Sequence, residues 1–222
     1  MISILRNTNN TRPVFIHGQV SRLFRSDRLT ACDEEDIKYL IDHNIVCVID
    51  LRNLEGKEFN ALLLSEKIDF NNVPLKYSAK EFENESEENE RSMAHYYMYF
   101  VKQYDKIKQV FDIILNSKSN ILVNCAFGRD RTGTIVALAQ MLCGCSDDEI
   151  IENYALTDKI FCDLKLEGLF KIKKYINYEL AKETMKNFIN LFLVEYESVN
   201  EYFSNLGYSS EEIKLLKSVI IS

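Results

Sequence analysis

Cys125 and Arg131 are the residues whose types and spacing best suit chemistry in this sequence. They bound a short loop within residues 120–133 (NILVNCAFGRDRTG), after an apolar segment and before a helical one. The backbone N–H groups of so short a loop can turn inward together, and the helix N-terminus adds partial positive charge. Arg131 can bind two phosphate oxygens with its planar guanidinium, and Gly128 permits a close backbone approach. Residues 125–131, the cradle loop, are therefore predicted to hold a phosphate group through Ala126, Phe127, Gly128, Arg129, Asp130 and Arg131.

The electrostatic field of such a loop favours a thiolate at Cys125, which makes this residue a nucleophile at neutral pH. The predicted chemistry is hydrolysis of a phosphate ester through a cysteinyl-phosphate. One carboxylate can protonate the leaving oxygen and then activate water. Asp130 is the first choice, and Asp50, at the end of the apolar segment 45–51, is the second. For Asp50, a structural salt bridge with Arg52 or Arg25 is an equal alternative.

Two further side chains of the loop region have alternative roles. The Thr132 hydroxyl either donates a hydrogen bond to the departing thiolate, caps the helix N-terminus, or does both. Arg129 either adds positive charge for a polyanionic substrate or is a solvated surface residue. An inert, buried Cys125 is the simplest alternative to catalysis, but it leaves the crowding of two arginines and an aspartate at a strand end unexplained.

Other functions fit the same residues less well. Gly128 and Gly133 have the outer spacing of a nucleotide-binding Walker A loop, but Thr134 stands where that loop requires lysine. Sulfur transfer by Cys125 would leave Asp130 and Arg131 without a role. Phosphate-ester hydrolysis uses all three residues.

Composition limits the class of protein and its partners. The 222 residues include 46% hydrophobic residues, and 27 basic against 34 acidic residues give a net charge of −7. This composition is typical of a globular protein and argues against a general nucleic-acid binder, which needs a basic face. No apolar run approaches the roughly 18 residues of a membrane span, so no stable membrane insertion is expected. The lack of a signal-peptide pattern and the scattered cysteines and histidines predict a cytoplasmic chain with reduced thiols, no metal site and no cofactor.

The hydrophobic pattern predicts the α/β class. We expect strands over 23–26, 45–51, 72–77 and 120–124, and helices from about residue 33, over 92–116 and over 132–142. From residue 146 onward the pattern is almost wholly helical, with capping-box spacing at 146–149 and 209–212. The apolar stripe at Phe188, Leu191, Phe192 and Val194 is expected to pack in the core. Ligands should bind at the carboxyl end of the strand 120–124.

The segment Cys125–Gly133 resembles the signature loop of the cysteine-dependent protein tyrosine phosphatases. It is most similar to a bacterial branch that acts on phosphotyrosine and phosphoinositides, whose loop reads Cys-x-x-Gly-Lys-Asp-Arg-Thr-Gly. Residues 23–29 (LFRSDRL) and 48–52 (VIDLR) are also similar to motifs of that branch. The resemblance implies a single phosphatase domain over 1–222, with a central, mostly parallel sheet flanked by helices and a helical lid within about 160–206. It also implies an acid at Asp130, a protein tyrosine or dual-specificity activity, and phosphorylated protein or phosphoinositide substrates.

Two positions depart from the family pattern. Asn124 precedes the nucleophile where the family usually has histidine, which predicts weaker stabilisation of the thiolate. Arg129 replaces the lysine of the branch and keeps its charge. Because of Asn124, a module of the same fold that binds phosphorylated ligands with little turnover is the alternative function.

Overall fold

The computed structural model describes residues 3–54, 66–76, 90–165 and 177–222, and its centre is a five-stranded sheet. In spatial order the strands are β1 (Arg12–Ile16), β2 (Gln19–Ser26), β5 (Asn120–Asn124), β3 (Ile45–Asp50) and β4 (Asp69–Asn72). β1 pairs antiparallel with β2, and the three remaining pairs are parallel. The predicted α/β class and mostly parallel sheet are therefore confirmed.

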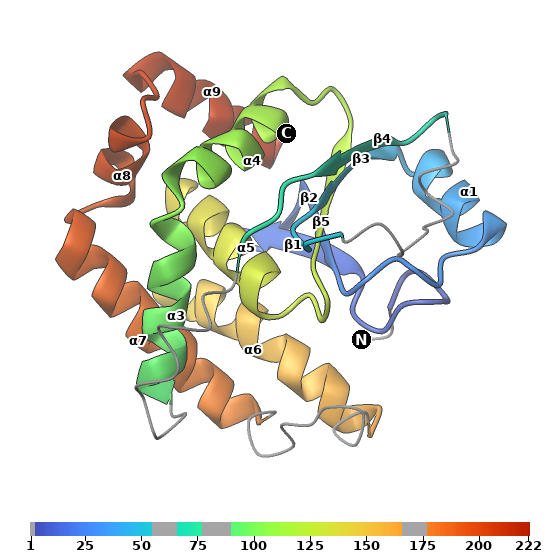
Figure 1. Ribbon diagram of the computed structural model, residues 1–222, viewed down its shortest axis with the longest axis horizontal. Coiled ribbons are helices and arrows are strands. Elements are labelled where there is room, and N and C mark those ends of the chain that lie inside the picture. Colours follow the sequence, from blue (N-terminus) through green and yellow to red (C-terminus); the bar gives the residue numbers. More distant parts are fainter. Residues whose placement is uncertain (1–2, 55–65, 77–89, 166–176) are drawn as a thin grey trace.

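Helices cover both faces of this sheet (Figure 1). Helix α1 (Glu34–Asp42) lies on one face, and the helices that follow β4 gather on the other. Those helices are α3 (Glu90–Val101), α4 (Tyr104–Asn116), α5 (Asp130–Leu142), α6 (Asp147–Asp163), α7 (Tyr178–Tyr196), α8 (Val199–Asn205) and α9 (Ser210–Ile221). Side-chain alternation along β3 serves both layers, because Cys47 and Ile49 join the larger core and Val48 joins the smaller core under α1.

The cradle loop connects the middle strand of the sheet to a buried helix. β5 has a parallel partner on each side, and its residues 121–124 are buried. Helix α5 is buried along most of its length, in agreement with its nearly continuous apolar sequence. The loop is thus attached at both ends to buried elements at the centre of the fold, at the carboxyl end of β5 where a ligand was expected.

Three predicted elements are wrong in their extent. The strand expected over 23–26 is the second half of the longer β2, which begins at Gln19. The helix expected over 92–116 is divided into α3 and α4 at Lys102 and Gln103. The Gln103 side-chain amide exchanges two hydrogen bonds with the Lys76 backbone, of 3.0 and 3.1 Å, and this contact with a distant segment holds the break. The strand expected over 72–77 instead occupies 69–72, because its parallel pairing with β3 runs from Cys47 to Asp50; residue 77 lies outside the described residues.

The capping boxes predicted at the start of two C-terminal helices are confirmed. In α6 the Ser146 hydroxyl accepts from the Glu149 backbone N–H, and the Glu149 carboxylate accepts from the Ser146 N–H. Ser209 and Glu212 make the same exchange at the start of α9.

The predicted lid falls partly on helices that belong to the main core. α7 packs along α3 and α6, and its residues Phe188 and Phe192 are fully buried, which confirms their expected packing role. Val194 is 85% exposed, so the core prediction is wrong for that residue. Residues 166–176 of the predicted lid lie outside the described residues.

None of the helices in the described ranges combines the length and the apolar character needed to cross a bilayer.

Candidate active site

Three consecutive carbonyl groups of the cradle loop point away from its interior. Each accepts a hydrogen bond from outside the loop: Arg28 N to Ala126 O (3.2 Å), Asn10 Nδ2 to Phe127 O (3.0 Å) and Arg25 Nη2 to Gly128 O (2.6 Å). No peptide bond in the described residues is cis, and a trans peptide directs its N–H opposite to its C=O. The N–H groups of residues 127–129 therefore point away from these outside partners, toward the inner side of the loop.

Gly128 is required by the close approach of this loop to β2. Its φ is +64°, in the left-handed region, and a Cβ at this position would lie 2.5 Å from the Ser26 carbonyl oxygen and 2.8 Å from Asn10 Nδ2. Any other residue would have to displace backbone. The prediction that Gly128 permits a close backbone approach is therefore confirmed, and the approach is to the Ser26 carbonyl of β2.

Cys125 and Arg131 lie at the two ends of the loop, and both are buried, with exposed fractions of 2% and 6%. Arg131 belongs to the first turn of α5, and its Nη1 donates to the Leu51 carbonyl oxygen over 3.2 Å, at the carboxyl end of β3. Its guanidinium is thereby directed across the end of the sheet that the loop also faces.

The Thr132 hydroxyl is buried and has no hydrogen-bond partner among the described residues. The N-cap of α5 is Arg129, three residues earlier. The alternative in which Thr132 caps the helix is therefore wrong, and the hydroxyl remains available to a group on the loop.

Arg25 holds the loop from behind. This fully buried side chain donates from Nη2 to Gly128 O and from Nη1 to Asn153 Oδ1, over 2.7 Å. Burial lowers the pKa of Arg25 to about 10, and the nearby Cys125 opposes that shift. Arg25 hence stays protonated at neutral pH and supplies positive charge near the Cys125 sulfur. Asn124, which directly precedes Cys125, carries no charge.

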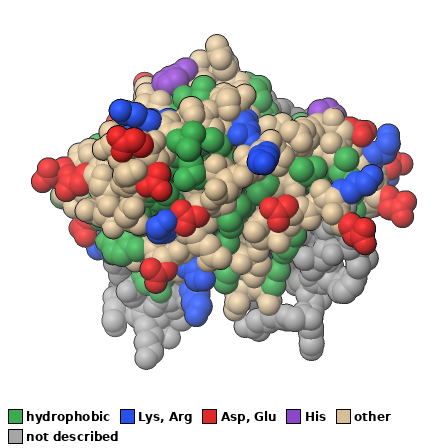
Figure 2. Space-filling view, turned by 90° about the horizontal axis from the view of Figure 1, so that it is seen from above, with side chains coloured by type: hydrophobic (Ala, Val, Ile, Leu, Met, Phe, Trp, Pro, Cys, Tyr) green, Lys and Arg blue, Asp and Glu red, His purple; other side chains and the backbone are tan. Residues whose placement is uncertain are grey.

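Arg12 adds a second buried cation beside Arg25. Its Nη2 donates to Asn153 O and Thr157 Oγ1, both over 3.0 Å, and burial followed by repulsion from Arg25 lowers its pKa. Within the described residues, neither arginine forms an ion pair. On the face shown in Figure 2, acidic and basic side chains are interspersed, whereas Arg12 and Arg25 place two buried cations behind the loop, where the buried Asp158 is paired with Arg129. The net acidic chain thus contains a local field that favours anions.

Asp130 is held by one of its two carboxylate oxygens. Oδ1 accepts from the Tyr97 hydroxyl over 2.6 Å and from Arg129 Nη1 over 3.0 Å. Burial and the neighbouring Asp130 carboxylate raise the pKa of Tyr97, which keeps the phenol protonated as a donor. Oδ2 has no hydrogen-bond partner among the described residues, so it is available for proton transfer.

The Arg129 side chain is bound inside the protein. It is 8% exposed, and its Nε and Nη2 contact the two carboxylate oxygens of Asp158 over 2.7 and 3.0 Å. The interpretation of Arg129 as a solvated surface residue is therefore wrong. Its guanidinium instead links the loop to α6 and to Asp130.

Asp50 forms the salt bridge that was its alternative role. The carboxylate is fully buried and accepts from the Arg52 backbone N–H and from Arg52 Nε and Nη2, at 2.7–3.0 Å. Both oxygens are used by Arg52. Asp50 therefore has a structural role as the partner of Arg52, just as Arg129 is the partner of Asp158.

Several residues behind the loop are absent from the sequence prediction, namely Asn10, Arg12 and Asp158. The position of Asp158 could have been predicted to be buried, since it lies four residues after Tyr154 and therefore on the same face of a helix. Asn10 lies just before β1 and Arg12 is its first residue. The hydrophobic pattern did not predict this strand, and nothing near these two residues in sequence marks a partner.

Comparison with known proteins gives a family and two structural similarities. The model of the family described as the tyrosine phosphatase family matches residues 17–222. Two structures of the Siw14 catalytic core are similar to the chain. The first, the core catalytic domain of the PP-IP phosphatase Siw14 from S. cerevisiae in complex with citrate, is 14% identical, with a TM-score of 0.48, and the match covers 87% of this chain and 96% of that one. The second is 16% identical, also with a TM-score of 0.48, and covers 86% and 94%. No curated protein gives a significant match.

Proposed function

Because this chain belongs to the tyrosine phosphatase family, we propose that it hydrolyses phosphate monoesters through a cysteinyl-phosphate formed on Cys125. One observation carries this proposal. The carbonyls of residues 126–128 are all bound on the outside of the loop, which directs the N–H groups of residues 127–129 inward. Such a ring of donors matches the oxygens of a phosphate group.

In the first step, the inward N–H groups and Arg131 bind the non-bridging oxygens of the phosphate. The Cys125 thiolate attacks phosphorus, and the bond from phosphorus to the ester oxygen breaks. Asp130 Oδ2 donates its proton to that oxygen, which leaves as a neutral alcohol or phenol.

In the second step, the Asp130 carboxylate accepts a proton from a water molecule, whose oxygen attacks phosphorus. The bond from phosphorus to sulfur breaks and returns the electron pair to Cys125. We assign stabilisation of this thiolate to the Thr132 hydroxyl and to the charge of Arg25. Asp130 rather than Asp50 is the general acid, since Arg52 occupies both oxygens of Asp50.

We propose phosphotyrosine as the preferred substrate, ahead of phosphoserine, phosphothreonine and phosphoinositides. In the branch that the loop resembles, the charge at position 129 would serve a polyanionic substrate, but the Arg129 side chain is engaged with Asp158 and Asp130. An aryl phosphate needs no cation beyond the loop itself. We keep the prediction of a cytoplasmic protein as part of this proposal. No cysteine forms a disulfide in the part of the chain that the structure describes, which leaves the Cys125 thiol available as a nucleophile.

The test is a turnover series on phosphotyrosine peptide, phosphoserine peptide and phosphoinositide, with the wild type and Cys125→Ser in parallel. We expect the highest kcat/KM on phosphotyrosine, and loss of all turnover in Cys125→Ser with phosphate binding retained. The alternative, a binding module, predicts phosphate binding without turnover in the wild type. That alternative rests on Asn124, which stands before Cys125 where the family usually has histidine. Asn124 is buried, and neither its Nδ2 nor its Oδ1 has a hydrogen-bond partner among the described residues.

A further inference from the structure

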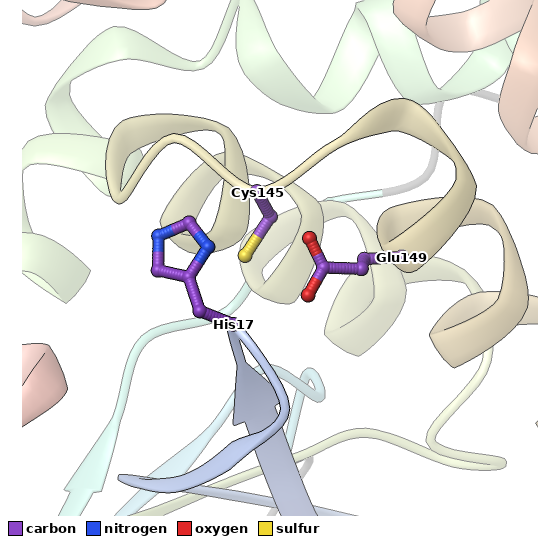
Figure 3. Close-up of side chains that lie close together, drawn as sticks. All are labelled: His17, Cys145 and Glu149. Atoms are coloured by element: carbon purple, nitrogen blue, oxygen red, sulfur yellow. The ribbon is translucent and has the colours of Figure 1, made fainter.

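His17 is brought by the fold to Cys145 and Glu149, which lie more than 120 residues further along the sequence and four residues apart. His17 lies in the two-residue turn between β1 and β2, Cys145 lies between α5 and α6, and Glu149 is in the first turn of α6. One nitrogen, sulfur or oxygen atom of each lies within 4.8 Å of the others. In Figure 3 the carboxylate and one ring nitrogen both face the Cys145 sulfur. The scattered sequence positions predicted no metal site, and the fold creates a set of ligand types that sequence spacing does not reveal.

The His17 ring is oriented as a metal ligand. Its Nε2 lies 3.0 Å from the Cys143 carbonyl oxygen, and because a carbonyl only accepts, Nε2 must carry the proton. In the neutral ring, the other nitrogen then presents its lone pair toward Cys145 and Glu149 (Figure 3). A backbone carbonyl that binds one ring nitrogen and fixes the tautomer is the usual outer partner of a metal-bound histidine.

Glu149 and Cys145 each offer an atom to the same point. Glu149 uses Oε2 to cap α6 through Ser146, which leaves Oε1 for a second ligand without loss of the cap. Cys145 is 9% exposed, and burial raises the pKa of its thiol. Metal binding would therefore have to release the thiol proton, which gives a measurable signal.

We propose that His17, Cys145 and Glu149 bind a divalent transition-metal ion, with zinc as the best match. Thiolate, imidazole and carboxylate are the three side-chain ligands of zinc in proteins, and donors on one tetrahedral ion lie about 3.5 Å apart. The three donor atoms now lie within 4.8 Å of one another, so binding would have to draw them closer together. Three protein ligands leave a fourth position open to solvent or to an external ligand.

The surroundings give that fourth position access. His17 is exposed, and a cavity of about 380 Å³ adjoins the cluster, lined in part by Gly18, Glu149 and Tyr178. The ion would connect the β1–β2 turn to the start of α6. That helix carries Asn153, Thr157 and Asp158, which bind the arginines behind and within the cradle loop.

The test uses the whole 222-residue chain with Cys125→Ser, so that the thiol of the cradle loop cannot bind metal, after treatment with a chelator. Cobalt(II) is titrated as a spectroscopic probe and is then displaced by zinc. We expect a thiolate-to-cobalt charge-transfer band that saturates at one equivalent, with proton release. Zinc should also raise Tm.

Matched variants assign the ligands. Cys145→Ser should abolish the charge-transfer band, while Cys162→Ser, at a cysteine about 20 Å from Glu149 along α6, should leave it unchanged. His17→Asn tolerates the positive φ of 51°, and Glu149→Gln can keep the capping box. Each should weaken binding by more than about tenfold, since even outer-shell partners are worth about 10- to 100-fold. An absence of one-equivalent binding in the parent, or a band that persists in Cys145→Ser, would overturn the proposal.

Discussion

The Arg25 guanidinium donates to the carbonyl oxygen of Gly128 over 2.6 Å and so fixes the orientation of the peptide between Gly128 and Arg129. The same fully buried cation lies close enough to Cys125 for the thiolate to raise its pKa against the effect of burial. One side chain from β2 thereby orients a donor of the cradle loop and places positive charge near Cys125. We propose that it serves the electrostatic role that a histidine at position 124 would have.

Arg25 is predicted to act as a positioning residue. Arg25→Gln removes a charge-assisted hydrogen bond and the charge near Cys125, which should lower kcat/KM on an aryl phosphate by about 10- to 100-fold. Arg25→Lys should recover part of that loss because it restores the charge. The alkylation rate of Cys125 at neutral pH distinguishes this role from a structural one. It should fall in Arg25→Gln and recover in Arg25→Lys, and equal rates in the two variants would count against the assignment.

Gly128→Ala should impair both stability and activity. The new methyl group would lie 2.5 Å from the Ser26 carbonyl oxygen at a φ of +64°, so the loop must move. Gly207→Ala is the matched control, because its φ is +94° but nothing lies within 4 Å of the added carbon. The control should lose only about 1–2 kcal/mol of unfolding free energy from backbone strain and keep its activity. Urea denaturation and kcat provide the comparison, and similar behaviour of the two variants would contradict the role of Gly128.

Asp130→Asn should lower kcat by about 100- to 10,000-fold on an alkyl phosphate, which needs a protonated leaving oxygen. The loss should be smaller on an activated aryl phosphate, whose leaving group departs more easily as an anion. Asp50→Asn breaks the buried pair with Arg52 and should reduce stability without this dependence on the leaving group. If the leaving-group effect followed Asp50 instead, the assignment of the acid would be wrong.

Asp158→Asn should destabilise the protein by about 3 kcal/mol, because it removes the fully buried one of the two carboxylates that balance Arg129. Replacement of both partners by apolar residues, in Arg129→Met with Asp158→Leu, should recover most of that loss. Chemical denaturation of the two single variants and the double variant gives the coupling energy. Additive effects would show that the pair does not act as a unit.

The cradle loop is predictable from sequence because its chemistry is local. Cys125, Gly128 and Arg131 lie within seven residues of one another, between a strand and a helix that each carry a clear hydrophobic pattern. The glycine has a φ and a contact that only glycine satisfies, so its presence in the sequence already encodes the bend.

The partners of the loop are not predictable in the same way. Arg25 and Tyr97 reach the loop from β2 and α3, more than 30 residues away. Nothing in the sequence distinguishes an arginine that will be buried from one that will be solvated. The break at Gln103 depends on Lys76, and the cluster of His17 with Cys145 depends on the packing of a hairpin turn against α6. Each is a product of tertiary packing, which short sequence windows do not contain.

The covalent intermediate is the most direct test of the central claim. Rapid quenching of the wild type during turnover of a phosphotyrosine peptide, followed by mass spectrometry of the digested protein, measures phosphate on each peptide. We predict one phosphoryl group per chain on the peptide that contains Cys125, lost in Cys125→Ser together with turnover. Steady hydrolysis without a phosphorylated Cys125 peptide, or hydrolysis that persists in Cys125→Ser, would contradict the account.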